Sequence, residues 1–315
     1  MIVFGPIPSR RLGRSLGINN IPPKTCTYSC VYCQVGKTDR MTLRRREFYA
    51  PERIAAEAAQ RVREVRAAGG GIDYLTFVAD GEPTLDLNLE ETIRRLAPLG
   101  VPVAVITNAS LLSRAPVRRA LASAAWVSVK VDAVDEAAWR KIDRPHGRLR
   151  LAEVLEGIAA FSRDYRGRLV TETMLVEGLN DGRAAVEKTA AFVAGIAPAA
   201  ACISIPTRPP AESGVRPPSP EVRREACVLF AAGGTPVEAL FGAEEGDFQG
   251  APDAAEGLLA IAAVHPMRES AVEEYLRSRG EDEALVRSLV AAGRLVRIEY
   301  GGEVFYRRSH PRSRS

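Results

Sequence analysis

The chain has 315 residues and a formal net charge of +4, with 46% hydrophobic and 26% charged residues, a composition typical of a soluble globular protein. No stretch approaches the roughly 18 apolar residues of a membrane-spanning helix, and the N-terminus lacks the apolar segment of a secretory signal. We therefore expect a cytoplasmic protein, and so mild a charge does not by itself predict a polyanionic partner.

Short runs rich in β-branched residues alternate with longer amphipathic runs through residues 1–242. The runs expected to form strands are 15–19, 72–79, 101–108, 126–133, 168–177, 201–207 and 235–241. The expected helices are 51–68, 88–97, 114–122, 150–163, 183–196 and 219–232. Near-continuous hydrophobic strands that alternate with helices are typical of a parallel sheet buried on both faces. The pattern predicts an α/β fold, either an open sheet or a full or partial barrel, with ligands at the carboxyl ends of the strands.

The alternation stops near residue 242, and residues 243–252 are rich in glycine and acidic residues, so we expect a linker there. Three further helices are expected at 253–264, 269–279 and 282–292. Two short extended runs joined by Gly301-Gly302 then predict a hairpin. Three helices before a hairpin are the layout of a winged helix, so we expect a small winged-helix-like domain over residues 253–308. The remaining residues, 309–315, are predicted to be a disordered basic tail.

Three of the five cysteines, Cys26, Cys30 and Cys33, fall within eight positions on the loop after the first expected strand. Disulfides are rare in cytoplasmic proteins. A zinc site would need a distant fourth ligand such as Cys202 or Cys227, and a Cys-x2-Cys redox pair would leave one thiol unused. Chance clustering of buried cysteines is a third alternative. Three thiolates can also hold a [4Fe–4S] cluster that leaves one iron open to a small molecule.

The spacing Cys-x3-Cys-x-aromatic-Cys, with Tyr32 at the aromatic position, resembles the signature of the radical S-adenosylmethionine (radical SAM) superfamily. The resemblance implies a partial (β/α)6 TIM-like barrel over residues 1–242, with Cys26, Cys30 and Cys33 as the metal ligands of a [4Fe–4S] cluster. It also implies that S-adenosylmethionine (SAM) completes the cluster and is cleaved reductively to a 5′-deoxyadenosyl radical that abstracts hydrogen from a substrate. No catalytic residue beyond the cluster ligands is assigned.

The segment Gly81-Glu82-Pro83 follows the second expected strand and resembles the Gly-Gly-Glu-Pro segment with which the superfamily binds the methionine amino group. Asp80 stands in place of the first glycine, which departs from the family pattern. An ordinary Gly-Glu-Pro turn is the alternative. The resemblance also places Asn108, at the end of the third expected strand, in the SAM pocket together with Tyr32.

Polar residues on two further strands are candidates for the pocket wall. Ser128, Lys130 and Asp132 share one face of the fourth expected strand because successive side chains alternate. This face matches the place where the superfamily contacts the ribose and carboxylate of SAM, and a solvent-facing edge strand is the alternative. On the fifth strand the candidates are Thr171, Thr173 and Met174, and Met174 is included among the predicted SAM contacts.

Closely spaced arginines flank the expected site and are candidates to hold an anionic substrate. These are Arg10, Arg11 and Arg14 before the cysteines and Arg208 after the sixth expected strand; solvated arginines are the alternative. Together with the cysteines and the Gly-Glu-Pro segment, they resemble the wyosine-synthase-like iron–sulfur oxidoreductases over roughly residues 3–240. The resemblance implies a one-electron reductant of the flavodoxin or ferredoxin class and no membrane partner.

Three functions remain open from the sequence. The first is a radical SAM enzyme that modifies tRNA or another RNA, and the second keeps this chemistry on a small metabolite or peptide. The third is an iron–sulfur sensor that regulates transcription through the winged helix. The expected recognition helix begins Glu281-Asp282-Glu283, which would repel phosphates, so we favour docking of a macromolecule or packing on the barrel over DNA reading. Arginines 294, 297, 307 and 308 are the alternative contacts to a nucleic-acid backbone.

Overall fold

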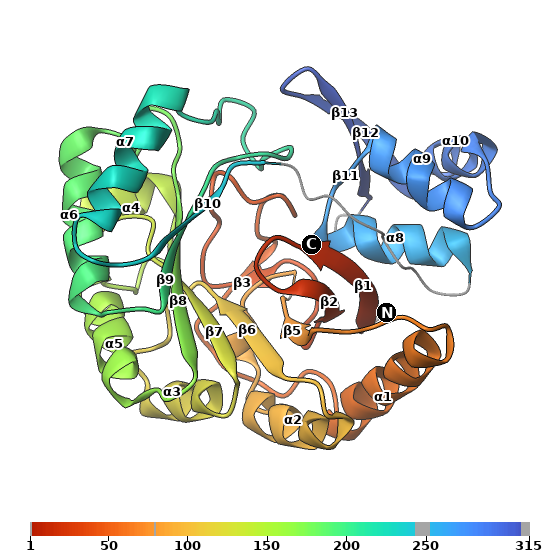
Figure 1. Cartoon of the computed structure of the whole chain (residues 1–315), viewed down its shortest axis with the longest axis horizontal. Helices are drawn as coiled ribbons and strands as arrows, with labels where there is room; N and C mark the ends of the chain where they lie inside the picture. The colour runs from red at the N-terminus through yellow and green to blue at the C-terminus, as the bar shows by residue number, and fades with distance from the viewer. Residues whose placement is uncertain (1, 79, 243–252, 310–315) are drawn as a thin grey trace.

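The computed structural model describes residues 2–78, 80–242 and 253–309, and its largest part is one curled eight-stranded sheet (Figure 1). In spatial order the strands are β1 (Val3–Ser9), β2 (Gly13–Ile18), β5 (Tyr74–Phe77), β6 (Val103–Thr107), β7 (Trp126–Lys130), β8 (Arg168–Met174), β9 (Ala200–Ser204) and β10 (Val237–Leu240). Strand β1 runs antiparallel to β2, and every later pair of neighbours is parallel. This sheet confirms the expected partial TIM-like barrel.

Six helices link the parallel strands and cover the outer face of the sheet (Figure 1). They are α1 (Pro51–Ala67), α2 (Leu89–Leu96), α3 (Ala115–Ala122), α5 (Leu151–Asp164), α6 (Arg183–Gly195) and α7 (Pro220–Ala231). Their bounds confirm the sequence prediction to within a residue. Pro51 and Pro220 occupy first-turn positions, where the missing N–H costs no hydrogen bond, and the Ser219 hydroxyl accepts from the Val222 amide at 3.3 Å.

Several elements, most of them short, were not expected from the sequence. They are β1, β3 (Thr25–Cys26), β4 (Arg40–Met41), α4 (Glu136–Ile142), β11 (Met267–Arg268) and the 3-10 turns η1 (Pro83–Leu85) and η2 (Ala97–Leu99). Strand β1 contains Pro6 and Pro8, which argue against a strand in the interior of a sheet. Because β1 is an edge strand of the sheet, it tolerates both prolines. Helix α4 is short, and the Asp135 carboxylate caps it by accepting from the Ala137 and Ala138 amides at 3.0 Å.

The barrel is filled by side chains near the amino ends of its strands. An apolar cluster there consists of Leu12, Ala104, Trp126, Val170, Ala200, Cys202 and Leu240. A larger apolar layer lies between the sheet and its helices, where the alternate residues Val127 and Val129 of β7 are fully buried. The floor of packed side chains leaves only the carboxyl ends of the strands available for a ligand.

The C-terminal module, residues 253–309, packs directly against this barrel. Its elements are α8 (Ala254–Val264), β11, α9 (Glu269–Ser278), α10 (Glu283–Ala291), β12 (Leu295–Tyr300) and β13 (Glu303–Arg308), with strand order β11-β13-β12. The three helices and the hairpin agree with the sequence prediction, whereas the winged-helix assignment stays a prediction. Leu258 and Ile261 of α8 share an apolar cluster with Phe4 and Ile7 of β1. Packing on the barrel is therefore one role of this module.

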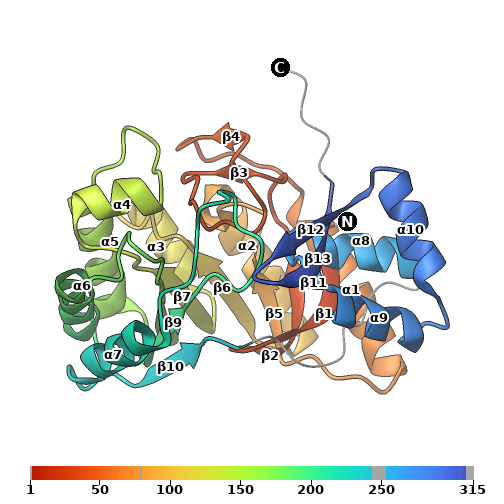
Figure 2. The ribbon, with the colours of Figure 1, turned by 90° about the horizontal axis from the view of Figure 1, so that it is seen from above.

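The hairpin of the C-terminal module reaches across toward the loop after β9 (Figure 2). At its turn, the Tyr300 hydroxyl donates to the Pro206 carbonyl oxygen at 3.3 Å. Arg307 and Arg308 face the barrel: Arg307 lies beside Gly36, and Arg308 lines a cavity of ≈160 Å³ with Asp80. Contacts of Arg307 and Arg308 with a nucleic-acid backbone stay a prediction.

Arg294 and Arg297, the other two arginines considered for a nucleic-acid backbone, are engaged within the module. Arg294 pairs with Glu256 at 2.7 Å and Arg297 with Glu299 at 2.8 Å. The predicted linker and all but the first residue of the predicted tail lie outside the described residues. Within the described residues, no helix is long and apolar enough to cross a membrane.

Candidate active site

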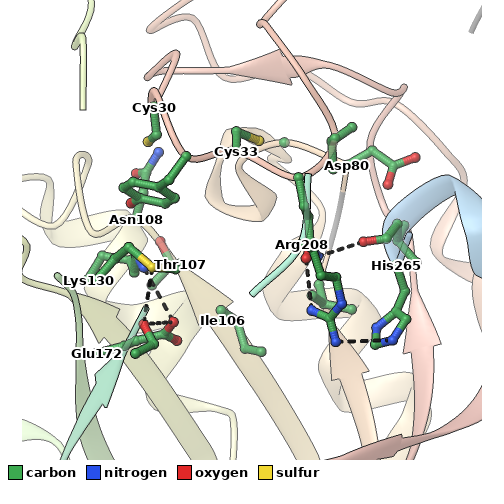
Figure 3. A pocket seen from close by; sticks show the side chains of 18 of the residues that line it. Cys30, Cys33, Asp80, Ile106, Thr107, Asn108, Lys130, Glu172, Arg208 and His265 are labelled. Carbon is green, nitrogen blue, oxygen red and sulfur yellow. Dashed lines mark hydrogen bonds and ion pairs between the residues drawn. The ribbon is translucent and has the colours of Figure 1, made fainter. Parts of the chain in front are cut away.

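A cavity of ≈310 Å³ opens at the carboxyl ends of the barrel strands, and all three clustered cysteines line it. Figure 3 shows Cys30 and Cys33 above the cavity, with Lys130 and Glu172 on one side and Arg208 and His265 on the other. Loops that follow β2, β5, β6 and β9 converge here because parallel strands direct their carboxyl ends to one edge. Cys202 and Cys227 do not line the cavity.

The cysteine loop is short and held by backbone hydrogen bonds. The Cys33 amide donates to the Cys30 carbonyl at 3.1 Å, and the Val31 amide donates to the Ile142 carbonyl at 2.9 Å. All three thiols are free, and burial raises the pKa of Cys26 to about 12 and that of Cys30 well above its ordinary value. Metal binding would have to displace these thiol protons, as it does in other thiolate sites.

The arrangement of the thiols suits a cluster better than a single ion. Among residues 2–78, 80–242 and 253–309, no three His, Cys, Asp or Glu side chains are placed to hold one metal ion together. A mononuclear zinc site needs such convergence. A [4Fe–4S] cluster would be bound by thiolates, and Cys26, Cys30 and Cys33 line one cavity. The three cysteines therefore fit a [4Fe–4S] cluster.

Gly81 allows the end of β5 to lie directly against the cysteine loop. The Glu82 amide donates to the Thr25 carbonyl at 3.1 Å. A Cβ atom on Gly81 would lie 1.9 Å from the Thr25 carbonyl oxygen, so no side chain fits there. The glycine of the Gly-Glu-Pro segment is required by this close approach.

Glu82 is buried and holds two strand ends together. One carboxylate oxygen accepts from the Thr84 and Thr107 hydroxyls at 2.6 and 2.7 Å, and the other accepts from the Asn108 amide at 2.7 Å. Burial raises the pKa of Glu82, whereas these hydrogen bonds act in the opposite direction. Asn108 in turn donates from its side chain to the Thr27 hydroxyl at 2.7 Å. The loops after β5 and β6 are thereby fixed to the cysteine loop.

Asp80, the departure from the family pattern, is a buried carboxylate at the cavity wall. It is 3% exposed, its Oδ1 accepts no hydrogen bond from the residues described, and burial raises its pKa to about 7. Its side chain points away from Cys33 and toward the C-terminal module (Figure 3).

Tyr32 and two carboxyl groups form the wall behind the cysteine loop. The Tyr32 hydroxyl donates to Asp132 and lies 3.4 Å from Asp143, and the Lys130 ammonium lies 4.8 Å from the Tyr32 ring centroid. The Cys30 thiol also donates to Asp143 at 3.4 Å. Burial, together with the nearby Asp132, raises the pKa of Asp143 well above its ordinary value. Asp143 had no signal in the sequence that marked it as part of the site.

The adjoining wall, on the β8 side of Lys130, carries a compact group of charges that the sequence revealed only in part. Glu172 on β8 pairs with Arg11, and the Lys130 ammonium lies 3.4 Å from its Oε1, where the Ser204 hydroxyl also donates at 3.1 Å. Met174 lines the cavity from the same face of β8 as Glu172. The alternation of β8 turns Thr171 and Thr173 away, so neither lines the cavity.

The candidate substrate arginines occupy different positions. Arg11 and Arg208 line the cavity, with Arg11 on Glu172 and Arg208 beside Gln34 and His265. Arg10 also lines it, yet its guanidinium donates to the Leu240 and Gly242 carbonyls and so links the two edges of the open barrel. Arg14 lies outside, where it makes an exposed ion pair with Asp73 at 2.9 Å.

Four of the predicted site residues do not line the cavity, namely Pro83, Ser128, Asp132 and Arg14. Ser128 is completely buried, and Asp132 lies behind the wall, where it contacts Tyr32 and accepts from the Met174 amide at 2.7 Å. Asp132 therefore supports two cavity residues without reaching the cavity. Gln34 and His265, which do line the cavity, were not expected from the sequence.

Comparison with known proteins agrees with this geometry. The family model of the radical SAM superfamily matches residues 20–192, which include all three clustered cysteines. The chain belongs to the radical SAM superfamily. Radical SAM enzymes bind a [4Fe–4S] cluster and SAM and need a reductant, so the expected cofactors are confirmed at the level of the family.

One curated relative matches nearly the whole chain. A UPF0026 protein of Methanocaldococcus jannaschii is 44% identical over 307 residues, which cover 97% of this chain and 95% of the relative. A radical SAM methyltransferase from Sphaerobacter thermophilus has a similar fold, with a TM-score of 0.53, 17% identity and coverage of 72% of this chain and 66% of that one. TYW1 with a bound lysine–pyruvate adduct gives a TM-score of 0.52, 16% identity and coverage of 70% and 73%.

Proposed function

We propose that this chain is a radical SAM enzyme that acts on a substrate held in the cavity at the barrel mouth. When bound, the cluster and SAM supply a reductive cleavage whose product, a 5′-deoxyadenosyl radical, abstracts hydrogen from the substrate. The observation that carries the proposal is that Cys26, Cys30 and Cys33 line one cavity with Gly81 and the polar wall around Lys130. A sensor that only carries a cluster would have no need of such a cavity.

The residues of the chain have several distinct roles in this proposal. Cys26, Cys30 and Cys33 hold the cluster, while Gly81 and Asn108 keep the neighbouring strand ends against the cysteine loop. The apolar floor of the barrel and the C-terminal module wall the cavity on two sides, which limits the access of water to a reactive radical. Lys130, Glu172 and Arg11 supply fixed charges that orient SAM and substrate.

Two substrate classes follow from different observations. An RNA substrate is supported by the resemblance to the wyosine-synthase-like group and by the similar fold of TYW1. A small metabolite or peptide is supported by the C-terminal module, since His265 lines the cavity and Arg307 and Arg308 face the barrel. We favour the small substrate because Arg297 of the hairpin pairs with Glu299 and because Arg307 and Arg308 lie against the barrel.

The physiological reductant is proposed to be of the flavodoxin or ferredoxin class. The three cysteine residues are half-buried, so a one-electron donor that docks over the cysteine loop would come close to the cluster. The cytoplasmic location expected from the sequence agrees with such a donor and remains a prediction.

A turnover assay tests the proposed chemistry. The anaerobically reconstituted protein with dithionite should convert SAM to 5′-deoxyadenosine and methionine, and alanine variants of Cys26, Cys30 and Cys33 should not. A protein that binds the cluster but leaves SAM intact would favour the sensor. Mass spectrometry of RNA and metabolites from deletion and wild-type cells then separates the substrate classes, since a change confined to RNA would overturn the preference for a small substrate.

A further inference from the structure

We propose that Gln34, Arg208 and His265 form a bridge through which the C-terminal module holds Cys33 in position. In this view Gln34 is a positioning residue for Cys33, and the module is a structural part of the cluster site. The importance of Cys33 rests on the proposed function, but the bridge itself consists of contacts within the protein chain and exists without the cluster.

The side-chain amide of Gln34, the residue directly after Cys33, is bonded at both ends. Its nitrogen donates to the Val264 carbonyl oxygen at 2.7 Å, and its oxygen accepts from the Arg208 guanidinium at 2.9 Å. The same guanidinium lies 3.1 Å from the His265 Nε2, so the three side chains form one connected network (Figure 3 labels Arg208 and His265). Each partner can satisfy only one orientation of the amide, so the network fixes Gln34 uniquely.

The far end of the bridge is anchored in the packed interior of the protein. Val264 and His265 end the buried helix α8 and are 5% and 7% exposed. Helix α8 itself packs on β1 of the barrel through the apolar cluster that contains Phe4 and Ile261. A contact to Val264 and His265 therefore connects the cysteine loop to a rigid element.

Arg208 is braced as well, because it follows β9 on the loop whose Pro206 accepts a hydrogen bond from Tyr300 of the hairpin. The C-terminal module thus contacts the bridge from two sides, through the end of α8 and through the hairpin. Both of these contacts would be lost together if the module separated from the barrel.

The chain just after Cys33 depends on this support because its nearest other ties are a tight local turn and an exposed ion pair of Lys37 with Glu212 at 3.1 Å. The next tie is the Thr38 amide, which donates to the Ser29 hydroxyl at 3.2 Å within the same loop. The Gly36 amide donates to the Cys33 carbonyl at 3.0 Å, which closes a tight turn, and Gly36 has a φ of +97°. Turns held by local bonds open more readily than segments tied to a packed element. The Gln34 amide supplies such a tie one residue from the thiol. Cys30 has a separate tie, since the next amide, that of Val31, donates to Ile142.

Alkylation of the metal-free protein tests the bridge without requiring turnover. Iodoacetamide modification of each cysteine is followed by peptide mass spectrometry in wild-type protein and in Gln34→Ala. We expect alkylation of Cys33 to accelerate by roughly 2- to 10-fold, the factor that loss of about one net hydrogen bond gives. Alkylation of Cys26 and Cys30 should stay at the wild-type rate. Deuterium uptake of a peptide spanning residues 33–38 should rise in parallel.

Three further variants separate the bridge from a general loss of stability. His265→Ala removes the far end of the bridge and should also accelerate the alkylation of Cys33. It provides the test if Gln34→Ala fails to fold. Gln34→Glu keeps an acceptor for Arg208 but offers no donor to Val264, so its rate should lie between those of wild type and Gln34→Ala. Gln60→Ala is the control, since it removes a side-chain amide that donates to Glu64 at 2.9 Å on the surface of α1. The alkylation rates of all three cysteines should stay at their wild-type values in this variant.

The proposed bridge would be wrong if the alkylation of all three cysteines accelerated equally. It would also be wrong if the alkylation rate of Cys33 stayed unchanged in either Gln34→Ala or His265→Ala. This result is independent of the proposed function, because the alkylation is measured on protein that holds no iron. Conversely, a wild-type protein that bound no iron would contradict the proposed function and leave the alkylation result standing.

Discussion

Gly81 makes the close contact between the end of β5 and the cysteine loop possible. A Cβ atom on Gly81 would lie 1.9 Å from the Thr25 carbonyl oxygen, so even one methyl group would overlap it. A flexible side chain could move aside, but this neighbour is backbone and belongs to the strand that carries Cys26. The glycine therefore connects a backbone requirement to the position of a cluster ligand.

Gly81→Ala should lower the free energy of unfolding by about 3 kcal/mol or more, because the overlap can be relieved only by a backbone shift. The same shift should reduce iron bound after anaerobic reconstitution. Thermal or urea unfolding and an iron assay measure the two effects. Gly147→Ala is the matched control, since no atom lies within 4 Å of its Cβ position, and it should behave as wild type.

Asp86 gives the protein a pH dependence that is independent of the cluster. Its carboxylate is buried and accepts from the Asn20 side chain at 3.1 Å and from the Asn88 amide at 3.0 Å. Burial nevertheless dominates and raises its pKa to about 6. A raised folded-state pKa means that the native protein binds this proton more tightly than the unfolded chain does.

The contribution of protonated Asp86 should therefore be complete below about pH 4 and disappear as the pH rises through 6, amounting to at most roughly 3 kcal/mol. In Asp86→Asn this part of the pH dependence should vanish. Urea unfolding of both proteins between pH 4 and 8 gives the free energy of unfolding as a function of pH. The contributions of other titrating groups cancel in the difference between the two curves. Parallel curves for the two proteins would show that Asp86 does not titrate in this range.

At the scale of elements, the most consequential packing is that of α8 on β1. Ile261 is fully buried in the apolar cluster that joins the module to Phe4 and Ile7. Because the cluster is shared, the barrel and the module should unfold together in one cooperative transition.

Ile261→Ala should lower the free energy of unfolding of the whole chain by about 2–5 kcal/mol, since it leaves a cavity in this shared cluster. Urea denaturation followed by circular dichroism and by the fluorescence of the barrel residues Trp126 and Trp139 measures this. Coincident transitions are expected from the two signals. A tryptophan transition unchanged from wild type, with only the helical signal affected, would show that the module unfolds by itself.

Helices and strands whose hydrophobic residues repeat at a regular spacing were predictable from the sequence, because that spacing indicates which face of the element is buried. Elements whose role depends on neighbours were not. Strand β1 contains two prolines and is possible only at the edge of the sheet. Glu172 lies among the polar residues Thr171 and Thr173, so the strand's sequence did not show which face lines the cavity.

The site shows the same limit of sequence reasoning. The three cysteines and Gly81 are local motifs, and the sequence was sufficient to place them together. His265 and Gln34 come together only when α8 docks on the barrel, and nothing in either local sequence indicates that contact. Ser128 and Asp132 share a strand face with Lys130, but only Lys130 reaches the cavity.

At the scale of the whole molecule, the central claim is that the chain provides three cluster ligands and leaves the fourth position to SAM. Cys202 lies in the apolar floor of the barrel, where burial raises its pKa to about 11, and Cys227 lies on the outer helix α7. Neither lines the cavity that holds the other three thiols. A Cys227→Ser variant should therefore retain the cluster.

The electron paramagnetic resonance spectrum of the reduced, reconstituted protein, recorded before and after addition of SAM, tests this claim most directly. We expect a [4Fe–4S] signal from about four irons per chain that changes when SAM binds the open iron, in wild type and in Cys227→Ser alike. Alanine variants of Cys26, Cys30 and Cys33 should lose the signal. A signal that SAM leaves unchanged, or one that disappears in Cys227→Ser, would contradict the account.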